Sequence, residues 1–318
     1  MYSAEGADTP YGIGPTHIVG RPSDSGDGAV SSPRPGRPWV TTGDTILDRF
    51  LGPFCASTVT LIDSGHPYVH DLSVRICART LADIRGGVVF VDGGNMFDPY
   101  SIVAHARRSG VTRDAALDRV RVARAFTAHQ MTSILHDSLA AELGAGDAGP
   151  RTIVISCLPD LYLDKDVWQS EALSMLGRAM GRVRELTKRC ELITIVTNHG
   201  LSKLASRKGL GKLLYSLVDR VVRMERGAGS GAGSDAGRRD PGGEHAYPWA
   251  FRAMSQRAMR GVMTVTLPRE GKAIAYRPVP GHQRVLDEYG PVTEAYEGAD
   301  DNDENDAEDG RAEVAGHG

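Results

Sequence analysis

Two histidines and a carboxylate lie within the short segment 63–70. It follows an apolar run, Thr-Val-Thr-Leu-Ile at 58–62, and precedes a stretch over 69–84 whose pattern predicts a helix. A strand, a tight turn and a helix in this order form a phosphate-binding corner when the turn is glycine-rich and ends in Gly-Lys-Ser/Thr. This turn has one glycine and no lysine, and Asp63 adds a charge that repels phosphate. The corner therefore has the outline of a phosphate site without its binding groups.

Metal binding is the alternative chemistry for this corner. His66 and His70 are four residues apart, a spacing that can place two imidazoles on one helix face and bind zinc. Carboxylates are expected nearby at the strand ends, at Asp63, Asp71 and Asp92. However, Pro67 is expected at the first helical position, which places His66 outside the helix. We therefore expect capping roles and no metal, and we expect no cofactor.

The remaining composition is that of a globular protein with 41% hydrophobic residues. No apolar run is long enough to cross a membrane, and the N-terminus lacks a secretory pattern. The thiols show no paired spacing and suit a reducing cytoplasm; they are Cys55, Cys77, Cys157 and Cys190. The sequence also shows no Gly-x-Ser-x-Gly elbow and no Cys/His nucleophile spacing, so no other enzyme class has positive support.

Charge is distributed unevenly along the chain. Residues 294–313 hold ten carboxylates and one arginine, a local charge of −9, which leaves +6 on the rest because the whole chain carries −3. This composition predicts a disordered acidic tail over 294–318. We also expect a disordered lead-in over 1–38 and a flexible Gly/Ser insertion over 227–243 within a core spanning 39–293. The tail would serve solubility, or compete with nucleic acid for a basic surface.

Short apolar runs alternate with amphipathic helical stretches through the core. Strands are expected at 88–91, 120–123, 152–156 and 192–197, and helices at 99–109, 129–142 and 170–190. This alternation predicts an α/β protein with a mostly parallel sheet and helices on both faces. Antiparallel strands are expected on the C-terminal side, over 213–224 and in a hairpin formed by 262–267 and 272–277 around the turn 268–271.

Several spaced motifs resemble the RecA/RadA recombinase superfamily, and in particular archaeal RadA- and RadB-like paralogues. The segment 117–126, Leu-Asp-Arg-Val-Arg-Val-Ala-Arg-Ala-Phe, continues to His129-Gln130-Met131 and is similar to the family signature almost residue for residue. The segments 41–52, 90–99 and 196–199 also resemble family motifs, so the likeness covers about 41–277. The resemblance implies a RecA-like three-layer core.

The departures from the family fall where the family performs its chemistry. Aligned with the family motifs, the P-loop lysine and threonine positions hold Val69 and His70, and the general-base glutamate position holds Gly94. Ser156 replaces the magnesium-organising aspartate, and His199 replaces a sensor-like glutamine. Phosphoryl transfer depends on positioning and on charge stabilisation by lysine and metal. We therefore expect a degenerate P-loop that does not hydrolyse ATP, although weak nucleotide binding at the helix N-terminus stays open.

The resemblance also suggests DNA contact through two loops. The first, 163–168, is short and acidic, whereas the second, 200–212, supplies four basic candidates for phosphate contact: Lys203, Arg207, Lys208 and Lys212. The basic helix 170–190 is expected to cover the sheet. No Phe-x-x-Ala polymerisation segment precedes the core, so we expect a homo- or hetero-oligomer, for example with a true recombinase or another RecA-fold paralogue.

Three hypotheses follow for the function. The first is a non-catalytic paralogue that acts as an accessory or regulatory protein in homologous recombination and DNA repair and contacts single-stranded DNA. The second is a RecA-family ATPase that still uses nucleotide in a remodelled pocket. The third is an interaction or signalling protein of the KaiC-like kind.

Overall fold

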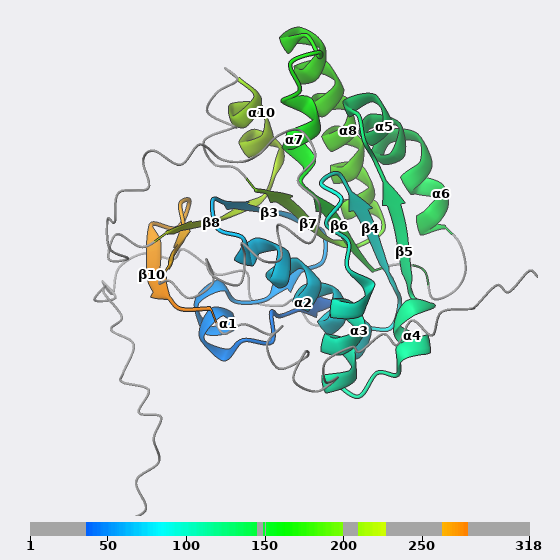
Figure 1. The fold of residues 1–318 in the computed structure, drawn as a ribbon, viewed down its shortest axis with the longest axis vertical. Coiled ribbons are helices and arrows are strands. Elements are labelled where there is room, and N and C mark those ends of the chain that lie inside the picture. The colour runs from blue at the N-terminus through cyan, green and yellow to red at the C-terminus, as the bar shows by residue number, and fades with distance from the viewer. Residues whose placement is uncertain (1–35, 145–148, 150, 200–208, 227–262, 279–318) are drawn as a thin grey trace, which may run out of the picture.

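The structure, a computed structural model, describes residues 36–144, 149, 151–199, 209–226 and 263–278. In this part of the chain, an eight-stranded sheet lies between two layers of helices (Figure 1). Its strand order is β10-β9-β8-β3-β7-β6-β4-β5. The strands are β3 (Thr58–Ser64), β4 (Val88–Asp92), β5 (Val120–Arg124), β6 (Thr152–Ser156), β7 (Ile193–Asn198), β8 (Arg220–Arg226), β9 (Met263–Leu267) and β10 (Lys272–Tyr276).

The strands from β8 to β5 run parallel to one another, and β9 and β10 continue the sheet in antiparallel pairing. This confirms the mostly parallel sheet with antiparallel strands on the C-terminal side. All residues of β4, β6 and β7 are buried, which explains why these strands are apolar runs and not alternating patterns. A separate two-stranded ribbon joins β1 (Trp39–Val40) to β2 (Phe54–Cys55).

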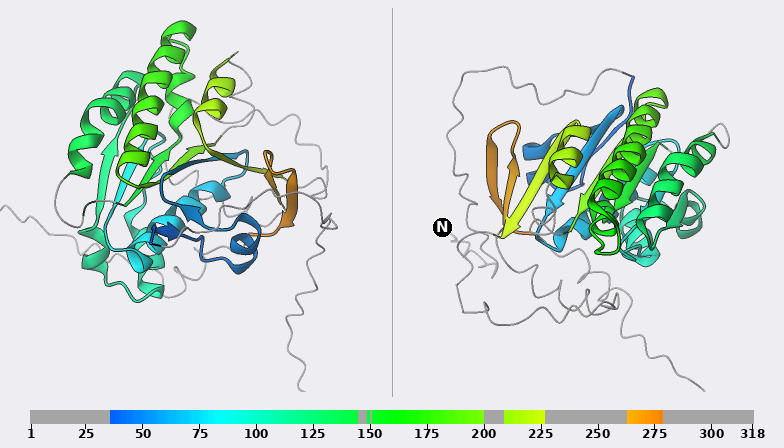
Figure 2. Two further views of the ribbon diagram at one scale, coloured as in Figure 1. Left: turned by 180° about the vertical axis from the view of Figure 1, so that it is seen from behind. Right: turned by 90° about the horizontal axis from the view of Figure 1, so that it is seen from above.

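Helices cover both faces of the sheet, as Figures 1 and 2 show. One layer comprises α1 (Thr45–Leu51), α2 (Tyr68–Asp83), α3 (Pro99–Arg108) and α4 (Arg113–Leu117). The other comprises α5 (Ala128–Ser133), η1 (Ile134–Ser138), α6 (Leu139–Leu143), α7 (Leu158–Tyr162), α8 (Gln169–Arg189) and α10 (Leu210–Leu217). The expected three-layer RecA-like core is therefore confirmed.

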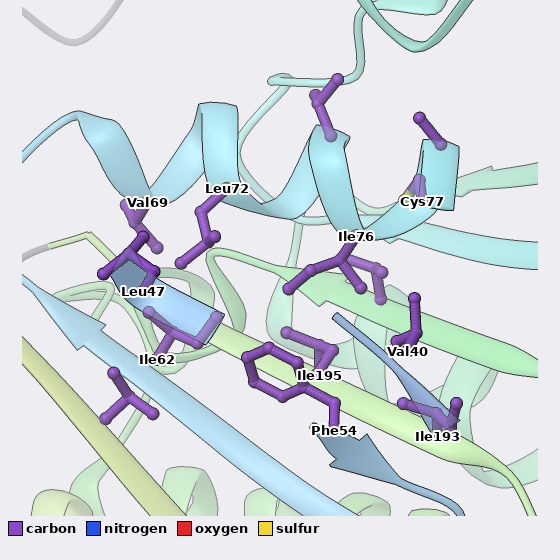
Figure 3. Close-up of a cluster of buried hydrophobic side chains, with 14 of the residues drawn as sticks. Val40, Leu47, Phe54, Ile62, Val69, Leu72, Ile76, Cys77, Ile193 and Ile195 are labelled. Carbon is purple, nitrogen blue, oxygen red and sulfur yellow. The ribbon is translucent and has the colours of Figure 1, made fainter. Parts of the chain in front are cut away.

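Each layer has its own apolar cluster against the sheet. On the α2 side, Ile62 of β3 and Ile195 of β7 lie beneath Val69, Leu72 and Ile76 of α2 (Figure 3). On the other side, α8 buries an apolar stripe and leaves its basic residues at the surface or only partly covered. This matches the expected amphipathic cover.

One expected element is right only in part. The first part of the stretch 213–224 is not a strand but belongs to the helix α10, and its second part forms β8, which pairs in parallel with β3 and antiparallel with β9. The apolar run conceals the boundary, which lies at Asp219. There the side chain of Asp219 accepts a hydrogen bond from the Val59 amide at 2.9 Å and the Asp219 amide donates to the Val59 carbonyl. This exchange at the start of β3 fixes β8 as its parallel neighbour.

The other expected elements agree to within one or two residues. The helix expected over 129–142 is present as α5, η1 and α6, with a π-helical turn in its middle. The hairpin between β9 and β10 is confirmed, with Gly271 at a positive φ of 64° in its turn.

The segments 1–35, 227–243 and 294–318 lie outside the described residues, so the domain boundaries stay predictions. No helix in the described ranges has the length and apolarity needed to cross a membrane.

Candidate functional site at the carboxyl ends of the strands

The corner between β3 and α2 directs its backbone amides inward. The Gly65 amide donates to the Met224 carbonyl at 3.1 Å, and the His66 amide donates to Ser64 Oγ at 2.8 Å. At the start of α2, the Tyr68 amide donates to His66 Nδ1 at 3.2 Å. The next two amides, of Val69 and His70, donate to the carbonyls of His66 and Pro67. Pro67 has no amide hydrogen, so every N–H from 65 to 70 has an acceptor within the protein.

The imidazole of His66 helps to close this turn. The residue is only 2% exposed, and its Nδ1 atom accepts the Tyr68 amide that would otherwise be an unsatisfied donor at the helix start. α2 begins at Tyr68, with Pro67 as its N-cap, so His66 lies outside the helix as expected. Pro67 was expected at the first helical position, but it occupies the N-cap, one position before it. In a phosphate-binding corner the ligand satisfies such amides, whereas here a side chain does.

The position expected for the P-loop lysine belongs to the apolar core. Val69 is fully buried, and Figure 3 shows its side chain pointing from α2 toward Leu47. Its neighbour His70 is half-buried on the first turn of the same helix. At this position the helix therefore presents an aliphatic side chain that is packed in the core.

Asp63 is bound by partners of the protein itself, so the expectation that its charge repels phosphate at the corner stays a prediction. The carboxylate is 1% exposed, and Asn198 Nδ2, at the end of β7, donates to its Oδ1 atom at 2.7 Å. The Tyr215 hydroxyl from α10 donates to Oδ2, and Arg223 Nη2 from β8 lies 3.6 Å from the same oxygen. Arg223 also donates to the Tyr215 hydroxyl at 2.7 Å. We call these four residues the Asp63 cluster; it joins β3, β7, α10 and β8.

Two pKa shifts reflect this cluster. Burial, together with the bond to Asp63, raises the pKa of Tyr215 to about 12, so its hydroxyl remains a donor at neutral pH. The hydrogen bond to Tyr215 raises the pKa of Arg223, whose guanidinium therefore stays charged. The carboxylate thus has a tyrosine and a cation as partners and is neutralised within the protein.

Asp92, a second carboxylate at the carboxyl ends of the strands, also has a structural role. Asp92, at the end of β4, is fully buried and accepts the amides of Gly94, Met96 and Phe97 at 3.2, 2.9 and 2.9 Å. Arg124 of β5 adds an ion pair at 3.5 Å. Asp92 therefore shapes the loop after β4, in the manner of an Asx turn.

Gly94 and Ser156, two further positions at which the sequence departs from the family motifs, meet beside Cys157. A Cβ atom built on Gly94 would lie 2.3 Å from Cys157 Sγ and 2.9 Å from Cys157 Cβ. A side chain at residue 94, where the resemblance places the general base, would therefore collide with Cys157. Ser156 is buried at the end of β6, where its hydroxyl donates to Cys157 Sγ at 3.7 Å and its carbonyl accepts the Gly93 amide.

The residues considered for a metal site have other partners. Asp71 accepts a hydrogen bond from Arg75 Nε at 2.7 Å and lies 3.6 Å from His105 Nε2. Burial opposes ionisation of Asp71, but His105 and Arg75 outweigh it and hold the pKa of this carboxyl below its ordinary value. Among the residues that the structure describes, no group of three or more His, Cys, Asp or Glu side chains could hold a metal ion.

The DNA-contact candidates are placed only in part. Lys212 is exposed on α10, two residues after the helix begins, while Lys203, Arg207 and Lys208 lie outside the described residues. In the first loop, Trp168 is 81% exposed directly before α8. An exposed indole beside a loop can stack on a nucleotide base. Sequence reasoning treated this loop as acidic and gave no role to its one aromatic residue.

Sequence reasoning also missed the Asp63 cluster and the role of Arg119. The Arg119 guanidinium donates to the carbonyls of Leu81, Ile84 and Gly86, and so binds the end of α2 and the connection that follows it to the start of β5. The position of Arg119 within the family signature 117–126 was the one sequence feature that could have indicated this role. In the same signature, Phe126 is 67% exposed, so it contributes little to packing.

The six parallel strands, the two helical layers and the corner between β3 and α2 define a RecA-like α/β core. A scan against protein-family models matches the Rad51 model at residues 40–211, which is more than half of the chain. The chain therefore belongs to the Rad51 family, a group of RecA-like proteins of recombination and repair. A search of curated proteins finds no match.

Proposed function

We propose that this Rad51-family protein is a non-catalytic, accessory member that works in recombination and repair without hydrolysing ATP. The observation that carries the proposal is the closed corner: each amide hydrogen from Gly65 to His70 is bonded to an acceptor of the protein itself. A triphosphate would have to break these bonds before it could form its own. Such a corner offers neither the donors nor the charge that phosphate binding requires.

The altered side chains support the same proposal. A charge-assisted hydrogen bond contributes about 1.5–3 kcal/mol, so valine in place of lysine costs roughly ten- to a hundredfold in nucleotide affinity. Gly94 has no space for a base, and Ser156 cannot supply the negative charge that organises magnesium. Water activation and charge stabilisation are both missing, and phosphoryl transfer depends on them.

The test is a measurement of ATP binding by calorimetry and of magnesium-dependent hydrolysis on the purified full chain. We expect no heat beyond weak millimolar binding and no turnover. A Val69→Lys/His70→Thr variant restores the lysine and the hydroxyl but leaves the amides bonded, so it should also lack turnover. Hydrolysis by the wild-type chain that persists through successive purification steps would show the proposal to be wrong.

We further propose that the protein contacts single-stranded DNA through the second loop, α10 and Trp168 of the first loop. Lys212 and Trp168 are exposed, a cation and an aromatic of the types that bind phosphate and stack on bases. Replacing the four basic candidates of 200–212 by alanine should weaken binding and make it less dependent on salt. The log–log slope should fall by about 0.7 for each phosphate that is no longer bound. Trp168→Ala should weaken binding and leave that slope unchanged. An unaltered affinity in both variants would exclude this surface.

The accessory role predicts a RecA-fold partner. Since the family assembles through its core, the resident recombinase should co-purify with the full chain from native extract. If tagged protein recovers no RecA-fold protein and is monomeric in light scattering, the accessory role is wrong even where the absence of hydrolysis holds.

A further inference from the structure

A cleft of ≈ 400 Å³ lies at the amino-terminal ends of β3 and β8, whereas the β3–α2 corner lies at the carboxyl end of β3. Its wall is completed by residues of β2 and of the turn between β9 and β10, and Figure 1 shows β10 beside β8. The volume is within the range of small-molecule sites, about 300–1,000 Å³. The polar and charged residues of its wall are Cys55, Ser57, Thr58, Thr60, Asp219, Arg220, Arg269 and Glu270.

The two carboxylates of the wall have cations of their own beside the cleft. Asp219 Oδ1 lies 3.8 Å from Arg184 Nη2, and Glu270 Oε2 lies 3.3 Å from Lys272 Nζ. Together with the wall arginines, the local set has four cations against two carboxylates, an excess of two positive charges. An excess of this sign in a concave wall attracts anions.

The wall arginines are held mainly by neutral acceptors. Arg269 donates to the carbonyls of Val218 and Asp219 at 2.9 and 2.7 Å and also to the carbonyl of Tyr215. Arg220 donates to the Leu51 carbonyl, and its Nε atom is 3.9 Å from Glu270, longer than a hydrogen bond. These contacts hold both guanidiniums in position, and the one carboxylate near Arg220 is at ion-pair distance without a hydrogen bond.

Arg220 is the more deeply buried of the two wall arginines. Its side chain is only 17% exposed and lies over the Phe54 ring, at 5.9 Å from the ring centroid. Burial lowers the pKa of Arg220. Glu270 and Cys55 raise it, but their combined effect is smaller, so the pKa lies below its ordinary value. A buried cation in this state is stabilised when an anion joins it.

We propose that this cleft is a binding site for a small organic anion that carries a carboxylate or a phosphate, with Arg220 as its principal charge partner. The site is separate from the β3–α2 corner and requires neither nucleotide hydrolysis nor DNA. Its ligand binds where the strands begin, so it contacts β3, β8 and the β9–β10 hairpin together.

The test titrates the full chain with inorganic phosphate and with succinate at constant ionic strength, in the absence of nucleotide and DNA. Binding is measured by calorimetry, and separately by protection of the Cys55 thiol from iodoacetamide in a Cys190→Ser background, because the two other cysteines are buried. We expect saturable binding of at least one probe. Arg220→Gln should weaken it by roughly 10- to 100-fold, the loss of one charge-assisted hydrogen bond.

Two further variants keep the test decisive. Arg113→Gln removes an exposed arginine of α4, remote from the cleft, and should leave binding unchanged. Thr58→Phe fills the cleft without altering either arginine and should abolish both binding and protection, which covers the case in which Arg220→Gln does not fold. Equal binding in wild type and Thr58→Phe would overturn the proposal. So would binding of a peptide with the acidic sequence 297–313 when neither small anion binds, because the occupant would then be the chain itself.

Discussion

Replacing Asp63 tests whether the β3–α2 corner depends on its internal carboxylate. Asp63→Ala removes the acceptor shared by Asn198, Tyr215 and Arg223, which come from β7, α10 and β8. Removing one partner of a buried charged pair costs about 3–5 kcal/mol, since the others are left buried without it. The Arg223 side chain is 37% exposed, so water partly solvates the remaining charge. We therefore expect a loss near the lower limit, about 3 kcal/mol.

The assay is urea denaturation followed by circular dichroism. A loss of about 3 kcal/mol is a large part of the 5–15 kcal/mol that stabilises a typical domain, but it leaves the variant folded without denaturant. The transition midpoint should fall while its slope stays the same, since the surface exposed on unfolding does not change. Asp137→Ala, at an exposed carboxylate of η1, is the matched control and should change stability by less than about 0.5 kcal/mol.

A double-mutant cycle separates the cluster from general damage. Tyr215→Phe alone should cost about 1.5–3 kcal/mol, the range for a hydrogen bond to a charged group. In the Asp63→Ala background it should cost much less, because the bond is already absent, which gives a coupling energy of at least about 1 kcal/mol. Additive losses, or a loss below about 1 kcal/mol for Asp63→Ala, would refute the role assigned to this cluster.

Three more predictions address packing and pH. Gly94→Ala should destabilise by about 1–3 kcal/mol in urea denaturation, because its Cβ would collide with Cys157, and Cys157→Gly should restore much of the loss; an undisturbed Gly94→Ala would contradict the close contact. Gly177→Ala on α8 meets open space and should raise stability by about 0.5–1 kcal/mol, so a decrease would show that this helix face is in contact. Because the folded pKa of Tyr215 is raised to about 12, its contribution is complete below pH 10, the unfolded value, and is lost as pH rises toward 12. The fall in stability over that interval should therefore be smaller in Tyr215→Phe than in the wild type or in the exposed-site control Tyr100→Phe, and an equal fall in all three would refute the assignment.

The sequence predicted the fold well because local periodicity and the spaced motifs agreed. Buried parallel strands are short apolar runs, and α2, α3 and α8 each begin and end within one or two residues of the expected positions. The failure at 213–224 has a physical cause: an apolar run contains no signal that separates a buried helix from a buried strand. Here the separating residue was Asp219, whose role depends on a backbone partner at Val59, 160 residues away.

The candidate site was predicted only where the chemistry is local. The missing lysine and the missing glycines are visible in eight consecutive residues, whereas the partners of Asp63 lie more than 130 residues further along the chain. A buried aspartate after an apolar strand therefore suggested a charge facing a ligand. Only the fold shows that this charge is already neutralised.

The proposed absence of nucleotide from the β3–α2 corner has a consequence for stability, because the amides of this corner are held by internal bonds. In a nucleotide-dependent corner, phosphate oxygens accept the amides at the helix start, so ligand binding adds to the stability of the folded state. In this corner, His66, Ser64 and main-chain carbonyls accept them, and Val69 adds its side chain to the core. Because no amide there awaits a ligand, the folded state should be complete without nucleotide. We therefore expect that restoring one residue of the motif does not create nucleotide binding, since the whole set of internal bonds would have to open together.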